Sequence, residues 1–307
     1  MALWDSFKLA LGALKGHKLR SFLTILGVVI GIASVISLLS VGRGAQAQVA
    51  AQVGALGTNL LFIQPGAPTQ GGVRGSVGGG NSLTLDDATA LSQVDGVAGV
   101  APVSTSFSQL VSPSGNMRSQ LVAPTPDYLA VRNLTISDGE FLTAQELTAR
   151  SMVAVVGANV AQTLFPDSSA VGQSLRLGNR PFRVVGVLQS QGGTAQGFQD
   201  DMVIVPMTTF KFRLQSQRTA AGAQSVQTIY IQVANEKQIP QTTDAIAQVL
   251  RDRHRIVPGG TDDFVITSQQ DILRTLQQVT GVFTIVLGAI ASISLLVGGI
   301  GIMNVML

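Results

Sequence analysis

The chain has 307 residues, of which 46% are hydrophobic and only 12% are charged. An average soluble domain carries roughly twice this share of charged residues, so the composition disfavours a purely soluble protein. The net charge of +3 does not indicate nucleic-acid binding, because residues 44–280 are almost neutral, with fifteen Lys/Arg and sixteen Asp/Glu. The chain has no cysteine, so a domain outside the cytoplasm must be stabilised by its core alone.

The first twenty residues have the pattern of an amphipathic helix. Trp4, Phe7, Leu11 and Leu14 recur at helical spacing, with lysines beside this face. Such a helix lies in the membrane interface, and we expect one on the cytoplasmic side over residues 1–20.

Two long uncharged runs follow the pattern of membrane-crossing helices. Residues 21–42 contain no charged side chain, and neither does the chain from Val279 to its end. Each run exceeds the roughly 20 apolar residues that a helix needs to cross the hydrocarbon core. We expect the first transmembrane helix over 21–42 and a second, truncated one over 281–307. The basic residues before the first run predict a cytoplasmic N-terminus and place residues 43–280 outside the cytoplasm.

The first run could also be read as a cleaved signal peptide, because "AQA" at Ala45–Ala47 resembles a cleavage site. A signal peptide has an apolar centre of roughly 7–15 residues, and this run is longer. We therefore expect a retained membrane anchor.

Both membrane runs are predicted to extend outward as helical stalks. Val49, Val53 and Leu56 follow the first run at helical spacing, while Ile272 and Leu276 form a stripe that leads into the second. Ser268 and Asp271 have the spacing of a capping box at the start of this second stalk. Two short helices that break at the membrane surface are the alternative.

The middle of the chain is predicted to be mixed α/β. Residues 58–122 and 223–270 are expected to form one α/β subdomain, and residues 123–222 an inserted β-rich lobe. Gly- and Ser-rich stretches at 65–82, 189–200 and 215–227 are either partner-contacting loops or solvated connections. The expected strands are 59–64, 117–122, 152–156, 182–188, 202–205, 228–233 and 264–267, and the expected helices are 85–93, 144–150, 159–165 and 241–254.

Residues that could carry chemistry are few. The two histidines, His17 and His254, fall on opposite sides of the predicted membrane, so they cannot share a metal. His254 lies in "RDRHR" and is expected to be an exposed histidine at a helix end. The doublets Asp86–Asp87, Asp200–Asp201 and Asp262–Asp263 fit helix starts and turns. No phosphate-binding G-x-x-x-x-G-K-[ST] motif occurs, so we assign no catalytic, cofactor-binding or metal-binding residue.

Glycines in the membrane runs predict close helix packing. Gly27 and Gly31 form a G-x-x-x-G motif in the first run, and Gly298, Gly299 and Gly301 lie in the second. The alternative is that glycine is simply common in membrane helices.

Several stretches in order resemble one family over the whole chain. They are "HKLRSFLTILGVVIGIASVISLLSVGRG", "LGTNLLFIQPG", "LTLDDATALSQVDGVAGVAPV", "VVGANVAQTLFP", "VGQSLRLGNRPFRVVGVL" and "GAIASISLLVGGIGIMNVML". Together they are similar to the MacB/FtsX-type permeases of ABC transporters, which include macrolide exporters and lipoprotein-releasing permeases.

The resemblance implies a fold and a set of partners. Such permeases have four membrane helices, a porter-like subdomain with an inserted lobe outside the membrane, and a second permease copy or paralogue in a dimer. ATP and Mg²⁺ are bound by a partner ATPase subunit or domain, and a periplasmic adaptor is a frequent partner. The chain then corresponds to the N-terminal half of an exporter permease in the cell membrane, where it transmits motion and carries out no bond chemistry.

Two other classes remain open at this point. A two-helix membrane sensor shares the cytoplasmic start, one outside domain and a returning helix. An anchored extracytoplasmic hydrolase lacks support from any nucleophile–base pair. The transported substrate is not indicated by the residues.

Overall fold

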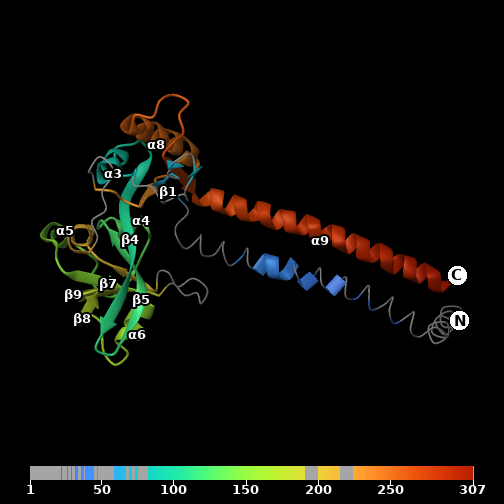
Figure 1. Cartoon of the computed structure of the whole chain (residues 1–307), viewed down its shortest axis with the longest axis horizontal. Helices are drawn as coiled ribbons and strands as arrows, with labels where there is room; N and C mark the ends of the chain where they lie inside the picture. The colour runs from blue at the N-terminus through green and yellow to red at the C-terminus, as the bar shows by residue number, and fades with distance from the viewer. Residues whose placement is uncertain are drawn as a thin grey trace. The chain divides into compact units, whose positions relative to one another are not determined.

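A computed structural model describes residues 59–66, 69–70, 73–74, 82–190, 200–214 and 224–306, together with helical positions between 22 and 47 (Figure 1). The chain divides into two compact units, one of residues Met1–Val53 with Ile272–Leu307, and a head of residues Gly54–Asp271. The predicted interfacial helix over 1–20 lies outside the described residues.

The head is built on one mixed sheet with the strand order β12-β1-β11-β4-β5-β10-β7-β9-β6, and β8 pairs with β4 and β9. Most neighbours are antiparallel, while β10 is parallel to β5 and β7 is parallel to β9. A separate pair joins β2 (Thr69–Gln70) and β3 (Val73–Arg74). The strands of the large sheet are β1 (Leu60–Pro65), β4 (Val97–Ser112), β5 (Gly115–Pro124), β6 (Ile136–Gly139), β7 (Val153–Val156), β8 (Ser174–Leu177), β9 (Arg180–Leu188), β10 (Met202–Ile204), β11 (Thr228–Val233) and β12 (Phe264–Ser268).

Short helices cover the sheet, and capping side chains fix where two of them begin. In α3 and α5 the side chain of the N-cap threonine and the acid three residues later satisfy each other's backbone N–H, at Thr84–Asp87 and Thr143–Glu146. The helices of the head are α3 (Leu85–Leu91), α4 (Tyr128–Val131), α5 (Ala144–Ala149), α6 (Ala158–Leu164), α7 (Met207–Thr209), the π-helical η1 (Phe210–Leu214), the 3-10 turn η2 (Glu236–Gln238) and α8 (Ile239–His254).

Strand β4 is long and connects the two halves of the sheet. Its first half, from Val97 to Val103, pairs with β11, and its second half, from Val103 to Ser112, pairs with β5. The sequence analysis missed this strand. Its residues include Gly99, Pro102 and four serines, which are weak strand formers, and pairing on both sides outweighs that local preference.

Three apolar clusters lie against the two faces of the sheet. In the first, β1 and β11 pack against α3 and α8; in the second, β5, β8, β9 and β10 pack against α6; in the third, α4 covers the opposite face. A fully buried Leu, Ile or Phe contributes roughly 1.5–3 kcal/mol. The residues with no exposed area include Leu61, Ile63, Leu91, Leu164, Leu175, Leu177, Val203, Ile229, Ile231, Ile246 and Leu250.

All seven predicted strands and all four predicted helices are present, so the prediction of a mixed α/β head is confirmed. Apart from β4, the elements that were not predicted are short: β6, β8, α4, α7, η1, η2 and the β2–β3 pair inside the 65–82 stretch. Most of that stretch, and of the two stretches at 189–200 and 215–227, lies outside the described residues.

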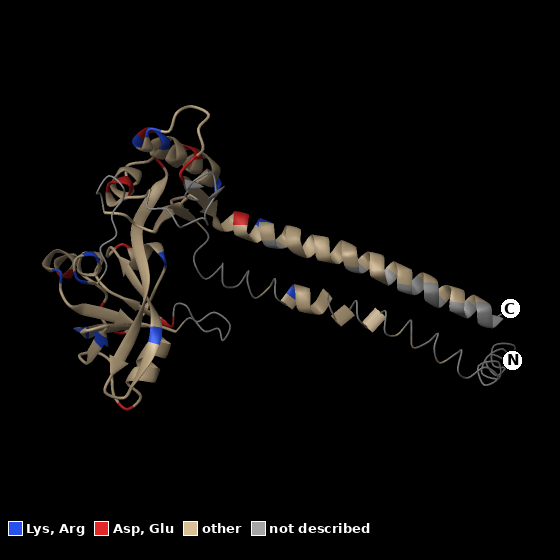
Figure 2. Ribbon diagram, in the orientation of Figure 1, with Lys and Arg blue, Asp and Glu red and all other residues tan. Residues whose placement is uncertain are grey.

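The second unit contains α9 (Gln269–Met306), a helix of 38 residues and about 57 Å by its rise per residue. It continues without a break past position 280. The alternative of two short helices would require a break there, at the predicted membrane surface. Along the described part of α9, Figure 2 shows Lys/Arg and Asp/Glu only near its beginning. Within the described residues, Gln269–Ile290 is the one stretch of helix long and apolar enough to cross a membrane.

Candidate functional site: the joint between the sheet and helix α9

Helix α9 begins directly where strand β12 ends. Strand β12 pairs antiparallel with β1, from Phe264 opposite Pro65 to Ser268 opposite Leu61. The Oγ and backbone N–H of Ser268 donate to Oδ2 of Asp271 at 2.6 and 3.1 Å, and the backbone N–H of Asp271 donates to Oγ of Ser268 at 3.1 Å. The predicted capping box is confirmed, and no residue separates the end of β12 at Ser268 from the beginning of α9 at Gln269.

The first turn of α9 is also tied to the entrance of α8. Nε2 of Gln270 donates to Oε1 of Glu236 at 2.7 Å. Glu236 lies in η2, immediately before α8, and Asn235 caps η2 by accepting the N–H of Lys237 at 3.0 Å. The beginning of α9 is therefore held by β12 on one side and by the η2–α8 segment on the other.

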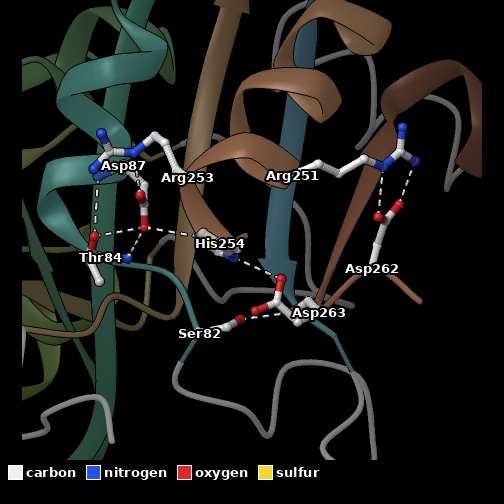
Figure 3. A network of polar contacts seen from close by, with 8 residues as sticks. All are labelled: Ser82, Thr84, Asp87, Arg251, Arg253, His254, Asp262 and Asp263. Atoms are coloured by element: carbon white, nitrogen blue, oxygen red, sulfur yellow. Dashed lines mark hydrogen bonds and ion pairs between the residues drawn. The ribbon is translucent and has the colours of Figure 1, made fainter. Parts of the chain in front are cut away.

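Asp263, just before β12, connects three parts of the head (Figure 3). Its backbone oxygen accepts the N–H of Gly66, at the end of β1, at 2.6 Å and the hydroxyl of Ser82, which precedes α3, at 2.7 Å. Its carboxylate Oδ1 lies 2.7 Å from Nδ1 of His254 at the end of α8. A Cβ at position 66 would lie 2.8 Å from the carbonyl carbon of Asp263, so only glycine permits this approach.

His254 lies between two carboxylates. Its Nε2 is 3.3 Å from Oδ2 of Asp87, and the side chains of His254 and Asp87 are 9% and 5% exposed. The hydrogen bond to Asp87, assisted by Asp263, outweighs burial and raises the pKa of His254 to about 9. Burial opposes the ionisation of Asp87, but hydrogen bonds from His254, Thr84 and Arg253 overcome it and hold the pKa of Asp87 well below its ordinary value.

Two arginines complete the network shown in Figure 3. Nε of Arg253 donates to Oδ1 of Asp87 at 2.7 Å, so the same carboxylate caps α3 and pairs with two cations of α8. Arg251 forms a bidentate pair with Asp262 through Nε at 2.7 Å and Nη2 at 2.6 Å. Because the Arg251–Asp262 pair is largely exposed, it contributes little to stability, whereas the Asp87 cluster is buried.

The arrangement corrects the expectation for His254 and defines its chemistry. The side chain is largely buried, not exposed as "RDRHR" suggested, because its partners come from α3 and the segment before β12. With both ring nitrogens against carboxylates, His254 is a buried cation and has no free nitrogen to act as a base. The described residues contain no cluster of three or more His, Asp or Glu side chains placed to hold a metal ion.

The packing residues predicted from sequence fall on the other unit, except Leu56, which falls within the head unit. Gly299 lies on α9, where a Cβ would meet no atom within 4 Å. It lines an open apolar hollow with Leu296, Ile300 and Met303. Gly298 and Gly301 are helical, but their burial is outside the described set, as is that of Leu276; Ile272 is half-buried. Gly27, Gly31, Val49, Val53 and Leu56 lie outside the described residues.

The joint and its network were not found from the sequence, apart from the Ser268–Asp271 box and the doublets. The cap formed by Asp87 confirms the prediction that this doublet opens a helix. The pairing of His254 with Asp87 spans 167 positions, and no local pattern signals it.

Comparison with known proteins identifies the family of this fold. The model of the MacB-like periplasmic core domain matches residues 21–249. The chain belongs to the MacB/FtsX-type ABC transporter permeases. The resemblance seen in the sequence is thus confirmed, the head is a MacB-like periplasmic core domain, and a two-helix sensor is not favoured. Membership of this family implies a membrane transporter with a domain outside the cytoplasm.

Curated relatives of this family align with nearly the entire chain. The chain is 36% identical over 304 residues to the macrolide export ATP-binding/permease protein MacB of Azoarcus sp. (strain BH72). That alignment covers 99% of this chain and 44% of the relative. The MacB protein of Rhodospirillum rubrum is 37% identical over 306 residues, with 99% and 45% covered. The chain therefore spans slightly less than half the length of these relatives, whose names combine an ATP-binding and a permease part.

Solved structures agree on the fold of the head. The crystal structure of the periplasmic region of MacB from Actinobacillus actinomycetemcomitans superimposes with a TM-score of 0.59 at 20% identity, covering 73% of this chain and 95% of that one. The extracellular domain of the noncanonic ABC-type transporter YknZ from Gram-positive bacteria gives a TM-score of 0.53 at 18% identity, with 68% and 100% covered. At these identities the likeness concerns the fold alone.

Proposed function

We propose that this chain is the permease part of an ABC-type exporter and that it transmits ATP-driven motion of its membrane helices to the head. The observation that carries the proposal is the joint: α9 starts directly at the end of β12, with the cap between Ser268 and Asp271 closing the junction. A helix fixed in this way moves together with the strand that precedes it, since no loop absorbs the displacement.

The proposed topology follows the charge pattern and the apolar helices. Residues 1–20 lie on the cytoplasmic side, residues 21–42 and 281–307 cross the cell membrane, and residues 43–280 lie outside. Family membership, the basic N-terminal residues and the length of α9 support this arrangement. Within the head, we propose a porter-like subdomain of 58–122 and 223–270 and an inserted lobe of 123–222. Two of the apolar clusters support this division, because one gathers around α3 and α8 and the other around α6.

The partners of the chain are part of the same proposal. ATP and Mg²⁺ bind to an ATPase subunit or domain, and no catalytic residue is assigned to this chain. A second permease copy or paralogue packs against the membrane helices near Gly299, and a periplasmic adaptor contacts the head. The names of the curated relatives support the ATPase and macrolide export.

The test distinguishes the effect of the cap at α9 on export from the effect of a less stable head. In the complete transporter, reconstituted with its ATPase in proteoliposomes, the double variant Ser268→Ala/Asp271→Ala removes the cap at α9. The matched control, Thr143→Ala/Glu146→Ala, removes the same kind of cap from α5. Each costs roughly 1 kcal/mol of stability.

We expect the variant at the joint to reduce ATP-dependent macrolide export severalfold while ATP hydrolysis continues, and the control to export normally. Equal export by both variants, at unchanged hydrolysis, would rule out transmission through this junction.

A further inference from the structure

Among the described residues, no helix covers one face of the sheet at the end far from α3 and α8. The opposite face of the same strands is covered by α6 and its apolar cluster. On the uncovered face the register of the strands places side chains of β4, β5, β8 and β9 together: Val111 lies opposite Arg176, and Gln109 lies opposite Arg118. We call the residues Phe107, Val111, Arg118, Arg176 and Arg183 the arginine face.

The strand register also shows that these side chains lie on the same face of the sheet. Opposite residues of antiparallel strands point to the same face, and so do residues two apart on one strand. Ser174, two positions before Arg176, lies opposite Arg183, which brings all three arginines to the face of Phe107 and Val111. Figure 2 shows basic residues on these strands at this end of the sheet.

The face is both apolar and cationic. Phe107 is 59% exposed and Val111 is 37% exposed, although both lie within a long regular strand. The guanidinium of Arg118 lies over the ring of Phe107, with Cζ 5.6 Å from the centroid. Arg118, Arg176 and Arg183 are all exposed. Exposed aromatic side chains beside arginine are enriched at the centres of protein interfaces, where lysine is depleted, and this face has no lysine.

The part of the chain that the structure describes supplies no counter-charge to this face. Among the described residues no ion pair involves these three arginines. Every Asp and Glu of the sequence except Asp5 lies in the described ranges, so the remaining segments have no acidic residue near enough in sequence to cover the face. A partner that binds this face is therefore expected to carry carboxylates that match these guanidinium groups.

We propose that the arginine face binds an acidic surface of another protein, with an apolar side chain of the partner seated beside Phe107 and carboxylates paired with Arg118, Arg176 and Arg183. This inference goes beyond the proposed transmission of motion and does not depend on the joint at α9. Arginine favours carboxylates because its planar fork binds both oxygens at once.

The test places a photo-crosslinking residue on the face. The complete protein, with p-benzoylphenylalanine in place of Phe107, is irradiated in its native host cells, and the crosslinked peptide is identified by mass spectrometry. The same residue in place of Gln162, an exposed position of α6 on the covered side, reports background. The charge variant Arg118→Glu/Arg176→Glu is compared with Arg213→Glu/Lys237→Glu, which changes the net charge equally at exposed positions elsewhere.

The proposal predicts a crosslink from position 107, absent at position 162, to an acid-rich surface segment of one protein. Its yield should fall about tenfold or more in Arg118→Glu/Arg176→Glu, stay unchanged in the matched control, and return when the partner's acids are changed to arginine. No crosslink, a crosslink to lipid or to a second copy of this chain, or a yield that responds equally to both charge variants would overturn it.

Discussion

Replacing His254 by glutamine should destabilise the head at neutral pH and leave it nearly unaffected in alkali. In the folded protein the hydrogen bond to Asp87, with Asp263 adding to it, raises the pKa of His254 from 6.5 to about 9. The folded state therefore binds a proton that the unfolded chain loses, and the stabilisation is complete below pH 6.5. It declines as the pH rises and is lost above about pH 9.

The magnitude follows from this change in pKa. At about 1.4 kcal/mol for each unit of pKa, the rise to about 9 corresponds to at most about 3 kcal/mol. Solvent screens part of this interaction, since Asp263 and Arg253 on the rim of the network are exposed, which leaves about 2 kcal/mol. The lowered pKa of Asp87 describes the same contacts from the side of the carboxylate and is not added to this value.

Urea unfolding of the complete chain in detergent micelles, followed by far-ultraviolet circular dichroism, measures this difference. We expect the free energy of unfolding of wild type to exceed that of His254→Gln by about 2 kcal/mol at pH 6. At pH 10 the two free energies should be nearly equal. Asp87 is ionised at both pH values in both proteins, and the two proteins share the other titrating groups, so those contributions cancel. A difference that is the same at both pH values would refute a protonated His254 between Asp87 and Asp263.

Three further changes test other parts of the structure. Lys211 is buried, with no hydrogen-bond partner for Nζ among the described residues, and burial lowers its pKa to about 8. Lys211→Met should therefore raise the free energy of unfolding by about 2 kcal/mol below pH 8, and the same urea assay should show this gain shrinking from pH 8 to 10.5. Gly66→Ala forces a Cβ against backbone and should cost about 1–3 kcal/mol, whereas Gly115→Ala, with open space, should be neutral; equal melting of both variants would contradict the close approach. Gly299→Leu should abolish export without changing unfolding of the head, while Gly281→Leu on the same helix should export; unaltered export by Gly299→Leu would remove its packing role.

Local patterns were enough to predict most elements of the head. "TIYIQV" alternates apolar and polar residues, and β11 has that alternation in its burial. Capping spacing located the beginning of α9, because these hydrogen bonds join residues three apart. Both kinds of signal depend on neighbours in the sequence.

The features that were missed depend on distant partners. Strand β4 is a strand because β11 and β5 flank it, and its own composition, with Pro102 and many serines, does not indicate one. His254 was expected to be solvated because four charged residues surround it in sequence, yet its ring turns toward Asp87 and Asp263. Such pairings follow from the tertiary fold, and a single sequence carries no record of them.

The central claim is that α9 and the sheet move as one across the junction after Ser268. Inserting Gly-Gly-Ser between Ser268 and Gln269 of the complete transporter introduces the flexible linker that the structure lacks, and the number of macrolide molecules exported per ATP hydrolysed is the quantity to measure. We predict that hydrolysis continues and that this ratio falls at least tenfold, whereas the same insertion at the β4–β5 turn after Pro113 leaves it unchanged. An unchanged ratio in the protein with the inserted linker at position 268 would contradict the account.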